Sequence, residues 1–204
     1  MPMPETVAII LAAGLSRRMG ARNKLLLPIQ GIPMIRHMVA TYHAATGQPV
    51  CVVTGHEADR VSGALEGAPV TLFYNADYAT GQATSVAVGL QAVPPCDRML
   101  MGLGDQPQIT SADIVALLAA HDRGDPTRIS IPGEADRRGN PIVIPYGLRA
   151  KLLADPRAPG CKKFTRAHPE HVQFHPLPNV GLYADVDTPA AYDALIRSTN
   201  EVIL

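Results

Sequence analysis

Short apolar runs alternate with amphipathic stretches along most of the chain. The run at 7–11 is continuously apolar, which is typical of a parallel strand that helices cover on both faces. Similar runs predict further strands, and the amphipathic stretches between them predict helices. The expected strands are 7–11, 50–53, 70–74, 98–103, 128–131, 141–144 and 172–175, and the expected helices are 33–46, 59–65, 84–93, 112–121, two short ones after 145 and a last one after Asp187-Thr-Pro189.

This order of elements predicts the architecture. Strands that alternate with helices form βαβ units, whose crossovers are nearly always right-handed. We therefore expect an α/β fold, a three-layer sandwich around a mostly parallel sheet. Ser111 is expected to cap the helix at 112–121, and Pro33 to open the helix that stops at Gly47. A length of 204 residues without a repeat or an evident linker fits one domain, 1–204.

Composition narrows the class of protein. Apolar residues make up 47% of the chain and charged residues 18%, which excludes intrinsic disorder. The 18 basic residues balance the 18 acidic ones, which disfavours a nucleic-acid-binding protein. The three cysteines form no C-x-x-C pair, as in proteins of the reducing cytoplasm. The first apolar run is too short for a membrane span and lacks the basic flank of a signal peptide. We expect a cytoplasmic protein that binds neither nucleic acid nor membrane.

A small, basic loop follows the first expected strand, where a parallel sheet usually binds its ligand. It reads Ala12-Ala-Gly-Leu-Ser-Arg-Arg-Met-Gly20, and Lys24 follows four residues later. Small residues let a ligand approach the backbone, whose N–H groups can hold phosphate oxygens. Arg17, Arg18 and Lys24 add positive charge. The loop is neither a Walker A motif nor a G-x-G-x-x-G motif, and a solvated connection is the alternative reading.

Acidic residues stand at two further places of interest. Asp105 follows the strand at 98–103, where a carboxylate can hold a hard cation such as Mg²⁺, although a plain turn would also place an aspartate there. Asp185 and Asp187 precede Thr188-Pro189. One of this pair can cap the last helix while the other binds a metal ion.

Together these segments resemble the MobA-like nucleotidyltransferase family, over about residues 6 to 195. Within that family the chain is most similar to the molybdenum cofactor cytidylyltransferases. The resemblance implies a Rossmann-like nucleotidyltransferase sheet. It rests on motifs that occur in the family's order: 11–20 with Asn23-Lys-Leu-Leu-Leu27 and Gly31-Ile-Pro33, then Gly81-Gln-Ala-Thr-Ser85, Gly104-Asp-Gln-Pro107, Arg138-Gly-Asn-Pro141 and Asp185-Val-Asp-Thr-Pro189.

The resemblance also implies a function. The enzyme would transfer CMP from CTP to the terminal phosphate of molybdenum cofactor, a molybdopterin-type acceptor, and release pyrophosphate. Mg²⁺ would be its cofactor, and a molybdenum hydroxylase would receive the product. Ala13 favours cytosine, because guanylyl-transferring relatives typically have glycine there. The implied roles are nucleotide binding for Leu11, Ala12, Ala13, Gly14, Thr84 and Ser85, triphosphate binding and catalysis for Arg18 and Lys24, catalysis and metal binding for Asp105, and metal binding for Asp187.

Two segments depart from the family pattern. Asn140 stands where many cytidylyl relatives have histidine, and 155–161 replaces a Gly-Asp-x-Gly-Ala-Arg stretch. Both are expected on the acceptor side, so they bear on the acceptor more than on the nucleotide. Two other functions stay open: cytidylyl or uridylyl transfer to a sugar or polyol phosphate, and a non-catalytic module that delivers nucleotide or cofactor to a hydroxylase.

Several other polar residues have simpler interpretations. We expect Lys162, Lys163 and Arg166 to form a solvated helix face, with contact to an anionic acceptor as the alternative. Cys161 is expected to be an ordinary thiol, and Cys51 a core residue. The last residues of interest are His168, His171 and His175, which share no helical face and are expected at the surface rather than on a metal.

Overall fold

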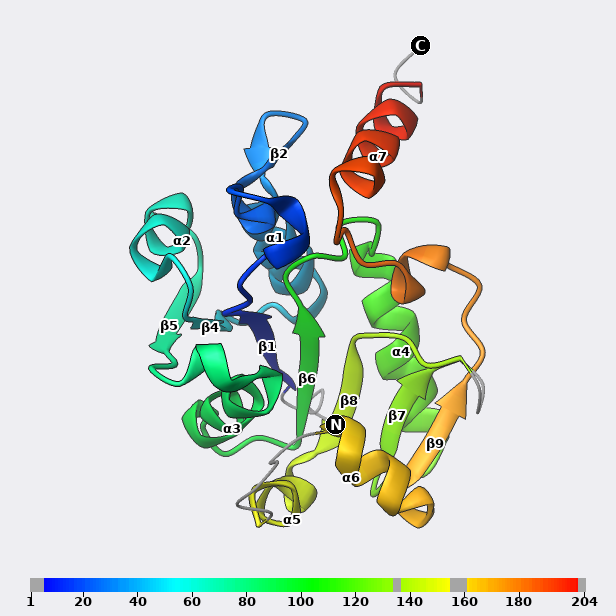
Figure 1. The fold of residues 1–204 in the computed structure, drawn as a ribbon. Coiled ribbons are helices and arrows are strands. Elements are labelled where there is room, and N and C mark those ends of the chain that lie inside the picture. Colours follow the sequence, from blue (N-terminus) through cyan, green and yellow to red (C-terminus); the bar gives the residue numbers. More distant parts are fainter. Residues whose placement is uncertain (1–5, 134–136, 155–160, 202–204) are drawn as a thin grey trace.

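The structure is a computed structural model that describes residues 6–133, 137–154 and 161–201. Within these ranges, seven strands form one sheet in the order β5-β4-β1-β6-β8-β7-β9 (Figure 1). Neighbours from β5 to β6 pair in parallel, β8 pairs antiparallel with β6 and β7, and β9 pairs parallel with β7. The strands are β1 Thr6–Ala12, β4 Val50–Thr54, β5 Val70–Tyr74, β6 Arg98–Leu103, β7 Ile129–Pro132, β8 Ile142–Pro145 and β9 Val172–His175.

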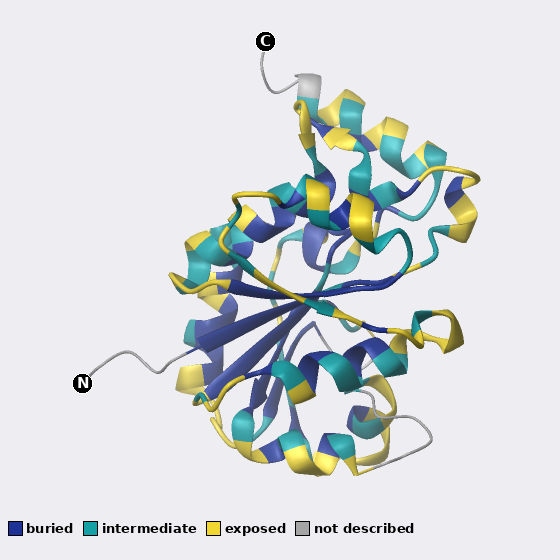
Figure 2. Cartoon of the chain, turned by 90° about the vertical axis from the view of Figure 1, so that its left-hand side faces the viewer, coloured by how far each residue is buried: buried dark blue, intermediate teal, exposed yellow. Residues whose placement is uncertain are grey.

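Helices cover both faces of this sheet, and Figure 2 shows the buried strands between the two helical layers. One face packs against α1 Met34–Thr46, α2 Ala58–Ala64 and α4 Ser111–Arg123. The other packs against α3 Gln82–Ala92, α5 Arg149–Leu153 and α6 Cys161–Ala167. The predicted three-layer α/β sandwich with a mostly parallel sheet is confirmed. Short 3₁₀ helices lie at Arg17–Met19, Lys24–Leu26, Tyr78–Thr80, Tyr146–Leu148, Pro169–His171 and Val180–Tyr183.

Strand β1 shows why its sequence is apolar at every position. Ala8 and Ile10 face the layer that contains α1, whereas Ile9 faces the layer that contains α3. Ile9 and Ile10 are both fully buried, because helices cover the strand on each side. Cys51 packs beside Ile9 in the same core cluster, which confirms it as a core residue.

A small third cluster lies above the carboxyl ends of the strands. The hairpin of β2 Pro28–Ile29 and β3 Ile32–Pro33 turns through Gln30 and Gly31, which have φ angles of 50° and 80°. The last helix, α7 Pro189–Glu201, packs against this hairpin, and Figure 1 shows both beyond the tip of β6. The Tyr192 hydroxyl donates to the Pro28 carbonyl at 2.6 Å.

Three local expectations were wrong by small margins. Pro33 ends β3 and precedes α1, which begins at Met34, because the chain enters the helix from an extended hairpin strand. Thr110, not Ser111, caps α4, and its hydroxyl and the Asp113 carboxylate form a reciprocal capping box. Neither aspartate of the acidic pair accepts the Ala191 N–H in the first turn of α7; the Thr188 hydroxyl does, at 3.2 Å.

Every helix in the described part of the chain is too short or too polar to cross a membrane.

Candidate functional site

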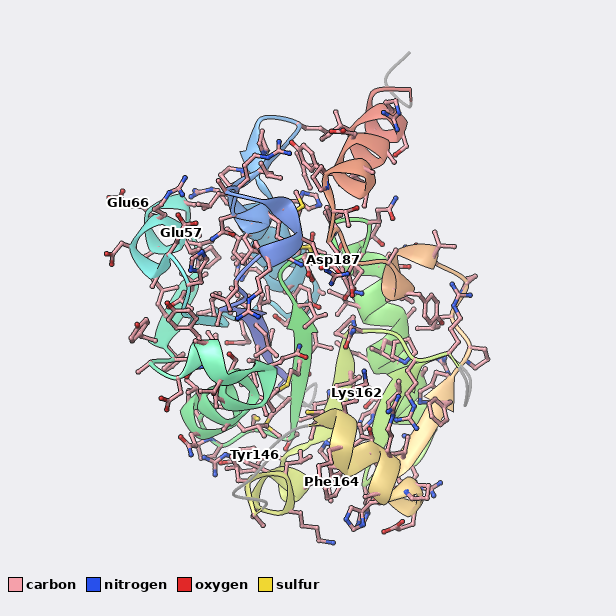
Figure 3. All side chains as sticks on the ribbon, in the orientation of Figure 1. Glu57, Glu66, Tyr146, Lys162, Phe164 and Asp187 are labelled. Carbon is pink, nitrogen blue, oxygen red and sulfur yellow. The ribbon has the colours of Figure 1, made fainter. Side chains whose placement is uncertain are left out.

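The candidate site lies at the carboxyl ends of β1 and β6, where the strand order reverses between β5-β4-β1 and β6. Lys24 Nζ pairs with Asp105 Oδ2 and lies 2.6 Å from Asp187 Oδ1. Arg18 contributes a guanidinium nitrogen 2.5 Å from the other oxygen of Asp187. In Figure 3, Asp187 lies above the tip of β6. The structure therefore brings the predicted catalytic and metal-binding side chains together in one cluster.

Two backbone hydrogen bonds hold the segments of this cluster in register. The Gly104 N–H donates to the Leu11 carbonyl at 3.2 Å, which joins the end of β6 to the end of β1. The Val186 N–H donates to the Asp105 carbonyl at 2.8 Å, which places the segment with Asp187 beside Asp105. The carboxylates thus belong to backbone segments that are fixed to the sheet.

The loop between β1 and Lys24 is anchored at both ends. Met19 and Leu25 are 2% and 3% exposed and pack into the core. The Asn23 side chain accepts from the Leu25 N–H at 3.1 Å, and the Lys24 N–H donates to the Ser16 hydroxyl at 3.3 Å. Lys24 is therefore positioned by its own backbone, with a side chain only 12% exposed.

The first residues of this loop lie where a ligand can meet them. Ala12 and Ala13 are buried, Gly14 is exposed, and Leu11 lines the large pocket described below. A Cβ atom added at Gly14 would have no neighbour within 4 Å, so the space beside its backbone is open. This combination of buried small residues and open backbone is the arrangement that close approach of a phosphate or a base requires.

Electrostatics in the cluster favour charged groups. Burial opposes the Lys24 ammonium, but the two aspartates outweigh it and the pKa of Lys24 is raised. Burial likewise opposes the Asp187 carboxylate, but Lys24 and Arg18 lower its pKa overall. Asp185 differs, because burial and repulsion from Asp105 and Asp187 raise its pKa. Lys24 and Asp187 therefore stay ionised, whereas burial and the neighbouring carboxylates favour the protonated form of Asp185.

The cluster contains a donor atom suited to a cation. Asp105 Oδ1 is buried and has no hydrogen-bond partner among the described residues. No group of three or more His, Cys, Asp or Glu side chains in the described ranges has the geometry of a complete metal site. Two neighbouring carboxylates, of which Asp105 has an unpaired oxygen, fit Mg²⁺ or Mn²⁺. Such ions keep several waters and take the remaining ligands from substrate phosphates. Asp105 and Asp187 would hold it.

Thr84 and Ser85 lie in the first turn of α3, beside a residue that the sequence did not single out. Asn75, which directly follows β5, donates from Nδ2 to both hydroxyls at 2.9 Å. Asn75 and Ser85 are 2% and 4% exposed, so this contact fastens α3 to the end of β5. In the sequence, the only sign that Asn75 belongs to the site is its position directly after an expected strand.

A second overlooked segment follows β4. A Cβ at Gly55 would lie 2.8 Å from the Ala13 Cβ and 2.5 Å from the Tyr78 Cβ, so only glycine fits between them. The His56 N–H donates to the Ala13 carbonyl at 3.4 Å, and its ring lies 6.1 Å from that of Tyr78. Glu57 adopts a positive φ of 50°, which is uncommon for this residue type. This segment forms the wall behind the small-residue loop.

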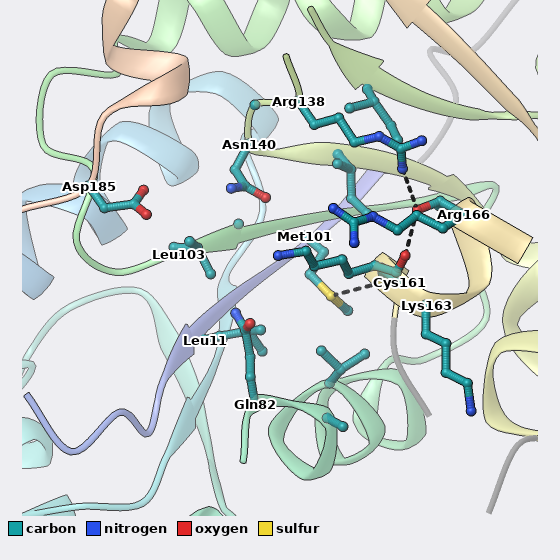
Figure 4. Close-up of a pocket in the computed structure, with 18 of the residues that line it drawn as sticks. Leu11, Gln82, Met101, Leu103, Arg138, Asn140, Cys161, Lys163, Arg166 and Asp185 are labelled. Carbon is teal, nitrogen blue, oxygen red and sulfur yellow. Dashed lines mark hydrogen bonds between the residues drawn. The ribbon is translucent and has the colours of Figure 1, made fainter. Parts of the chain in front are cut away.

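A pocket of about 1280 Å³ opens beside the cluster, between α3, β6, β8 and α6 (Figure 4). Leu11, Gln82 and Asp185 line it on the side of the small-residue loop. The lining also includes four cationic side chains, together with Asn140 from the departing Arg138-Gly-Asn-Pro141 motif. The four cations are Arg138, Lys162, Lys163 and Arg166.

The pocket bears on the interpretation of α6. Its basic residues were expected to form a solvated helix face, and Lys162, Lys163 and Arg166 are indeed exposed. All three also line the pocket, so the alternative, contact with an anionic acceptor, stays open.

Most of the other departing segment, 155–160, lies outside the described residues. Burial raises the pKa of the Cys161 thiol to about 12, so it is an unreactive thiol as expected. His168 and His171 follow α6; the ring of His171 stacks on Phe164 at 5.8 Å, and the ring of His168 lies tilted against it at 4.7 Å.

Comparison with known proteins gives the family. The model of the MobA-like NTP transferase domain matches residues 8–172. Nicotine blue oxidoreductase of Paenarthrobacter nicotinovorans is 28% identical over 194 residues, which are 91% of this chain and 94% of that protein. The bifunctional protein GlmU of Allorhizobium ampelinum is 38% identical over 118 residues, 56% of this chain but only 26% of that longer protein.

Solved structures agree on the fold. A nucleotidyl transferase from Methanothermobacter thermautotroptrophicus has a TM-score of 0.82 at 22% identity, with 97% of this chain and 99% of that chain covered. The Rv0371C protein of Mycobacterium tuberculosis, solved in complex with manganese, has a TM-score of 0.72 at 26% identity, with 95% and 99% covered. Since the domain model accounts for the chain from within β1 to the first residue of β9, the protein is a member of the MobA-like NTP transferase domain family.

Proposed function

We propose that this protein is a divalent-metal-dependent cytidylyltransferase that transfers CMP from CTP to the terminal phosphate of molybdenum cofactor. The observation that carries the proposal is the contact of Lys24 with both Asp105 and Asp187 at the mouth of the small-residue loop. This cluster joins a cation for the triphosphate to two carboxylates for a metal. The proposal places the protein in the cytoplasm, where its product passes to a molybdenum hydroxylase.

The reaction needs charge stabilisation more than proton transfer. The acceptor phosphate is already an anion, so no general base is required, and catalysis depends on positioning two polyanions. A bound divalent ion supplies Lewis-acid charge at the α-phosphate. In the proposal, Lys24 and Arg18 bind the β- and γ-phosphates and stabilise charge on the departing pyrophosphate. The open backbone at Gly14 binds the nucleotide, and Ala13 favours the cytosine ring.

Pyrophosphate release tests the catalytic cluster. With CTP, Mg²⁺ and molybdopterin, Lys24→Ala and Asp105→Asn are each expected to lower kcat about 10²- to 10⁴-fold, because each removes one electrostatic stabiliser. Asp193→Asn, an exposed carboxylate on α7, is the charge-matched control and should retain wild-type activity. Rates within about tenfold of wild type for either cluster variant would overturn the proposal.

Arg18 has its own matched control. Arg18 pairs with Asp187. The adjacent Arg17 is also exposed and belongs to the same 3₁₀ turn. Arg18→Ala should therefore lower kcat/KM for CTP more than Arg17→Ala does. Equal losses in the two variants would show that only the general charge of the loop matters.

A second candidate function comes from the similarity to nicotine blue oxidoreductase, which extends over 91% of this chain. A protein with this function would catalyse the oxidation or reduction of nicotine blue. Turnover of nicotine blue, followed by its absorbance, without pyrophosphate release from CTP would favour it. Pyrophosphate release that depends on Lys24 would favour the transferase.

A further inference from the structure

Cations of the protein itself bind most of the carboxylate oxygens that the proposed metal ion would use. Lys24 Nζ pairs with Asp105 Oδ2 and also lies 2.6 Å from Asp187 Oδ1. The Arg18 guanidinium lies 2.5 Å from Asp187 Oδ2. Among the described residues, the only oxygen of these two carboxylates without a partner is Asp105 Oδ1, which is buried. A divalent ion must therefore share its ligands with two side chains of the protein.

The fold holds Lys24 between the two carboxylates. Its backbone N–H donates to the Ser16 hydroxyl at 3.3 Å, and its side chain is 12% exposed. The hydrogen bond from the Val186 N–H to the Asp105 carbonyl joins the two segments that carry the carboxylates. The Arg18 side chain is 67% exposed, so solvent and salt screen its ion pair much more than those of Lys24. The Lys24 contacts are therefore the stronger barrier to another cation.

An ammonium and a divalent ion compete when they use the same carboxylates. Lys24 has a compact positive charge with three N–H donors, so this one group can pair with both Asp105 and Asp187. A divalent ion bound to the same oxygens would face that charge directly, and like charges repel strongly in a partly buried site. Binding of the ion therefore requires the ammonium to leave at least one carboxylate.

We propose that Lys24 is an internal counter-cation that competes with the divalent ion for Asp105 and Asp187, and that the triphosphate relieves this competition by giving the ammonium a new partner. The inference rests on the proposed nucleotidyl transfer, in which Lys24 binds the β- and γ-phosphates. Metal ion and nucleotide then bind as a coupled pair, and each raises the affinity for the other by the same factor. The divalent ion alone binds weakly.

Titration with Mn²⁺ in the absence of nucleotide tests the competition, and the electron paramagnetic resonance signal of the free ion reports binding. Lys24→Met removes the ammonium but keeps an unbranched side chain, and it should bind Mn²⁺ at least about tenfold more tightly than wild type. Arg18→Met should give a smaller gain, because its ion pair is exposed. Loss of the Lys24 ammonium is thus expected to slow catalysis but to strengthen metal binding, whereas a damaged fold would weaken both.

Two controls locate the effect. Arg17→Met removes one exposed positive charge from the same 3₁₀ turn as Arg18 and should change the Mn²⁺ affinity by no more than about threefold, because exposed charges are screened. Lys24→Met combined with Asp105→Asn should lose the gain, since Mn²⁺ bound elsewhere would be insensitive to the second substitution. Thermal denaturation checks the fold of each variant, and the exposed Arg18 keeps the test available if Lys24→Met does not fold.

The outcomes separate this inference from the proposed reaction. Mn²⁺ affinity that is equal in wild type and in the Lys24 and Arg18 variants would overturn the competition, and so would an equal gain in Arg17→Met. If Lys24→Met gains affinity but wild type releases no pyrophosphate from CTP, the counter-cation stands and the proposed reaction fails. If wild type releases pyrophosphate and Lys24→Met gains no affinity, the reaction stands and the counter-cation fails.

Discussion

Gly102 in β6 lies directly against Tyr42 of α1. A Cβ at this position would lie 1.8 Å from the Tyr42 hydroxyl oxygen. Tyr42 is fully buried, and its hydroxyl has no partner in the described part of the chain. Burial and the nearby charge of Asp105 raise its pKa, so the hydroxyl stays neutral. A single methyl group added at Gly102 would therefore prevent α1 from packing this closely against the sheet.

Gly102→Ala is therefore expected to lower the free energy of unfolding by about 1–3 kcal/mol through overpacking. Tyr42→Phe removes the nearest blocking atom, an unpaired buried hydroxyl, and should change stability by no more than about 1 kcal/mol. It relieves the overpacking only in part, because the ring Cζ would still lie 2.7 Å from the added Cβ. Urea denaturation of the two single variants and the double variant measures their coupling. Additive effects in the double variant would contradict the proposed clash.

At the residue scale, the sequence indicated the charged members of the site well. Lys24, Asp105 and Asp187 follow loops and strand ends whose position a parallel sheet dictates, and the structure brings them together. Asn75 and Gly55 could not be found in this way. Their importance comes from contacts with Ser85 and Ala13, and those contacts arise only when separate strands lie side by side.

At the scale of the element, two adjacent hydroxyl residues at the start of α4 have different roles. The Thr110 hydroxyl accepts from the Asp113 N–H, while Ser111 is the first helical residue. Thr110→Ala is expected to lower the free energy of unfolding by about 1 kcal/mol, and Ser111→Ala should cost little. Chemical denaturation of both variants measures the difference. A larger loss in the Ser111 variant would contradict the capping box. The sequence alone could not separate the two residues, because serine and threonine are both preferred at the N-cap position.

The contact of α4 with β7 and β9 contains a buried polar network. Ser130, which is fully buried, lies 2.8 Å from His121 Nδ1 and 3.0 Å from His175 Nε2 and from Gln173 Nε2. Burial and the charge of Arg98 lower the pKa of His121 below its ordinary 6.5. Burial and Arg123 likewise lower that of His175. A serine hydroxyl can donate one hydrogen bond and accept two, which suits neutral imidazoles.

This network predicts a pH dependence of stability. Below pH 6.5 the unfolded chain binds protons that the folded histidines resist, so the free energy of unfolding falls as the pH falls. His121→Gln combined with His175→Gln should flatten this decline between about pH 7 and pH 5. Urea denaturation across this range measures the slope. An unchanged slope in the double variant would place the acid sensitivity elsewhere.

At the scale of the whole molecule, the bound nucleotide should stabilise the fold. CTP with Mg²⁺ at about 100 times its dissociation constant adds about 2.7 kcal/mol to the free energy of unfolding. Asp105→Asn should weaken that gain, and GTP, ATP and UTP should produce smaller shifts than CTP. Thermal denaturation with each nucleotide measures this. A shift with GTP alone would change the assigned base, and no shift with any nucleotide would contradict nucleotide binding in the absence of acceptor.

The arrangement of layers was largely predictable, whereas the direction of one strand was not. Each expected strand exists. The central strands are buried on both faces, as their continuous apolar runs predict, whereas the edge strand β5 exposes Leu72 and Tyr74. β8 runs antiparallel between β6 and β7. The available signal was the lack of a helix between the runs at 128–131 and 141–144, since parallel neighbours need a long crossover. That the basic residues of α6 line a pocket was expected only as the alternative interpretation of Lys162, Lys163 and Arg166.

The pairing of Lys24 with Asp187 joins positions that are 163 residues apart. Closing so long a loop is slow, because its entropy cost precedes the contact that offsets it. The Lys24 ammonium therefore gains its second carboxylate, Asp187, only after the intervening strands and helices have assembled. Nucleotide affinity should therefore be the last property to return when the denatured chain refolds, later than helix content measured by circular dichroism.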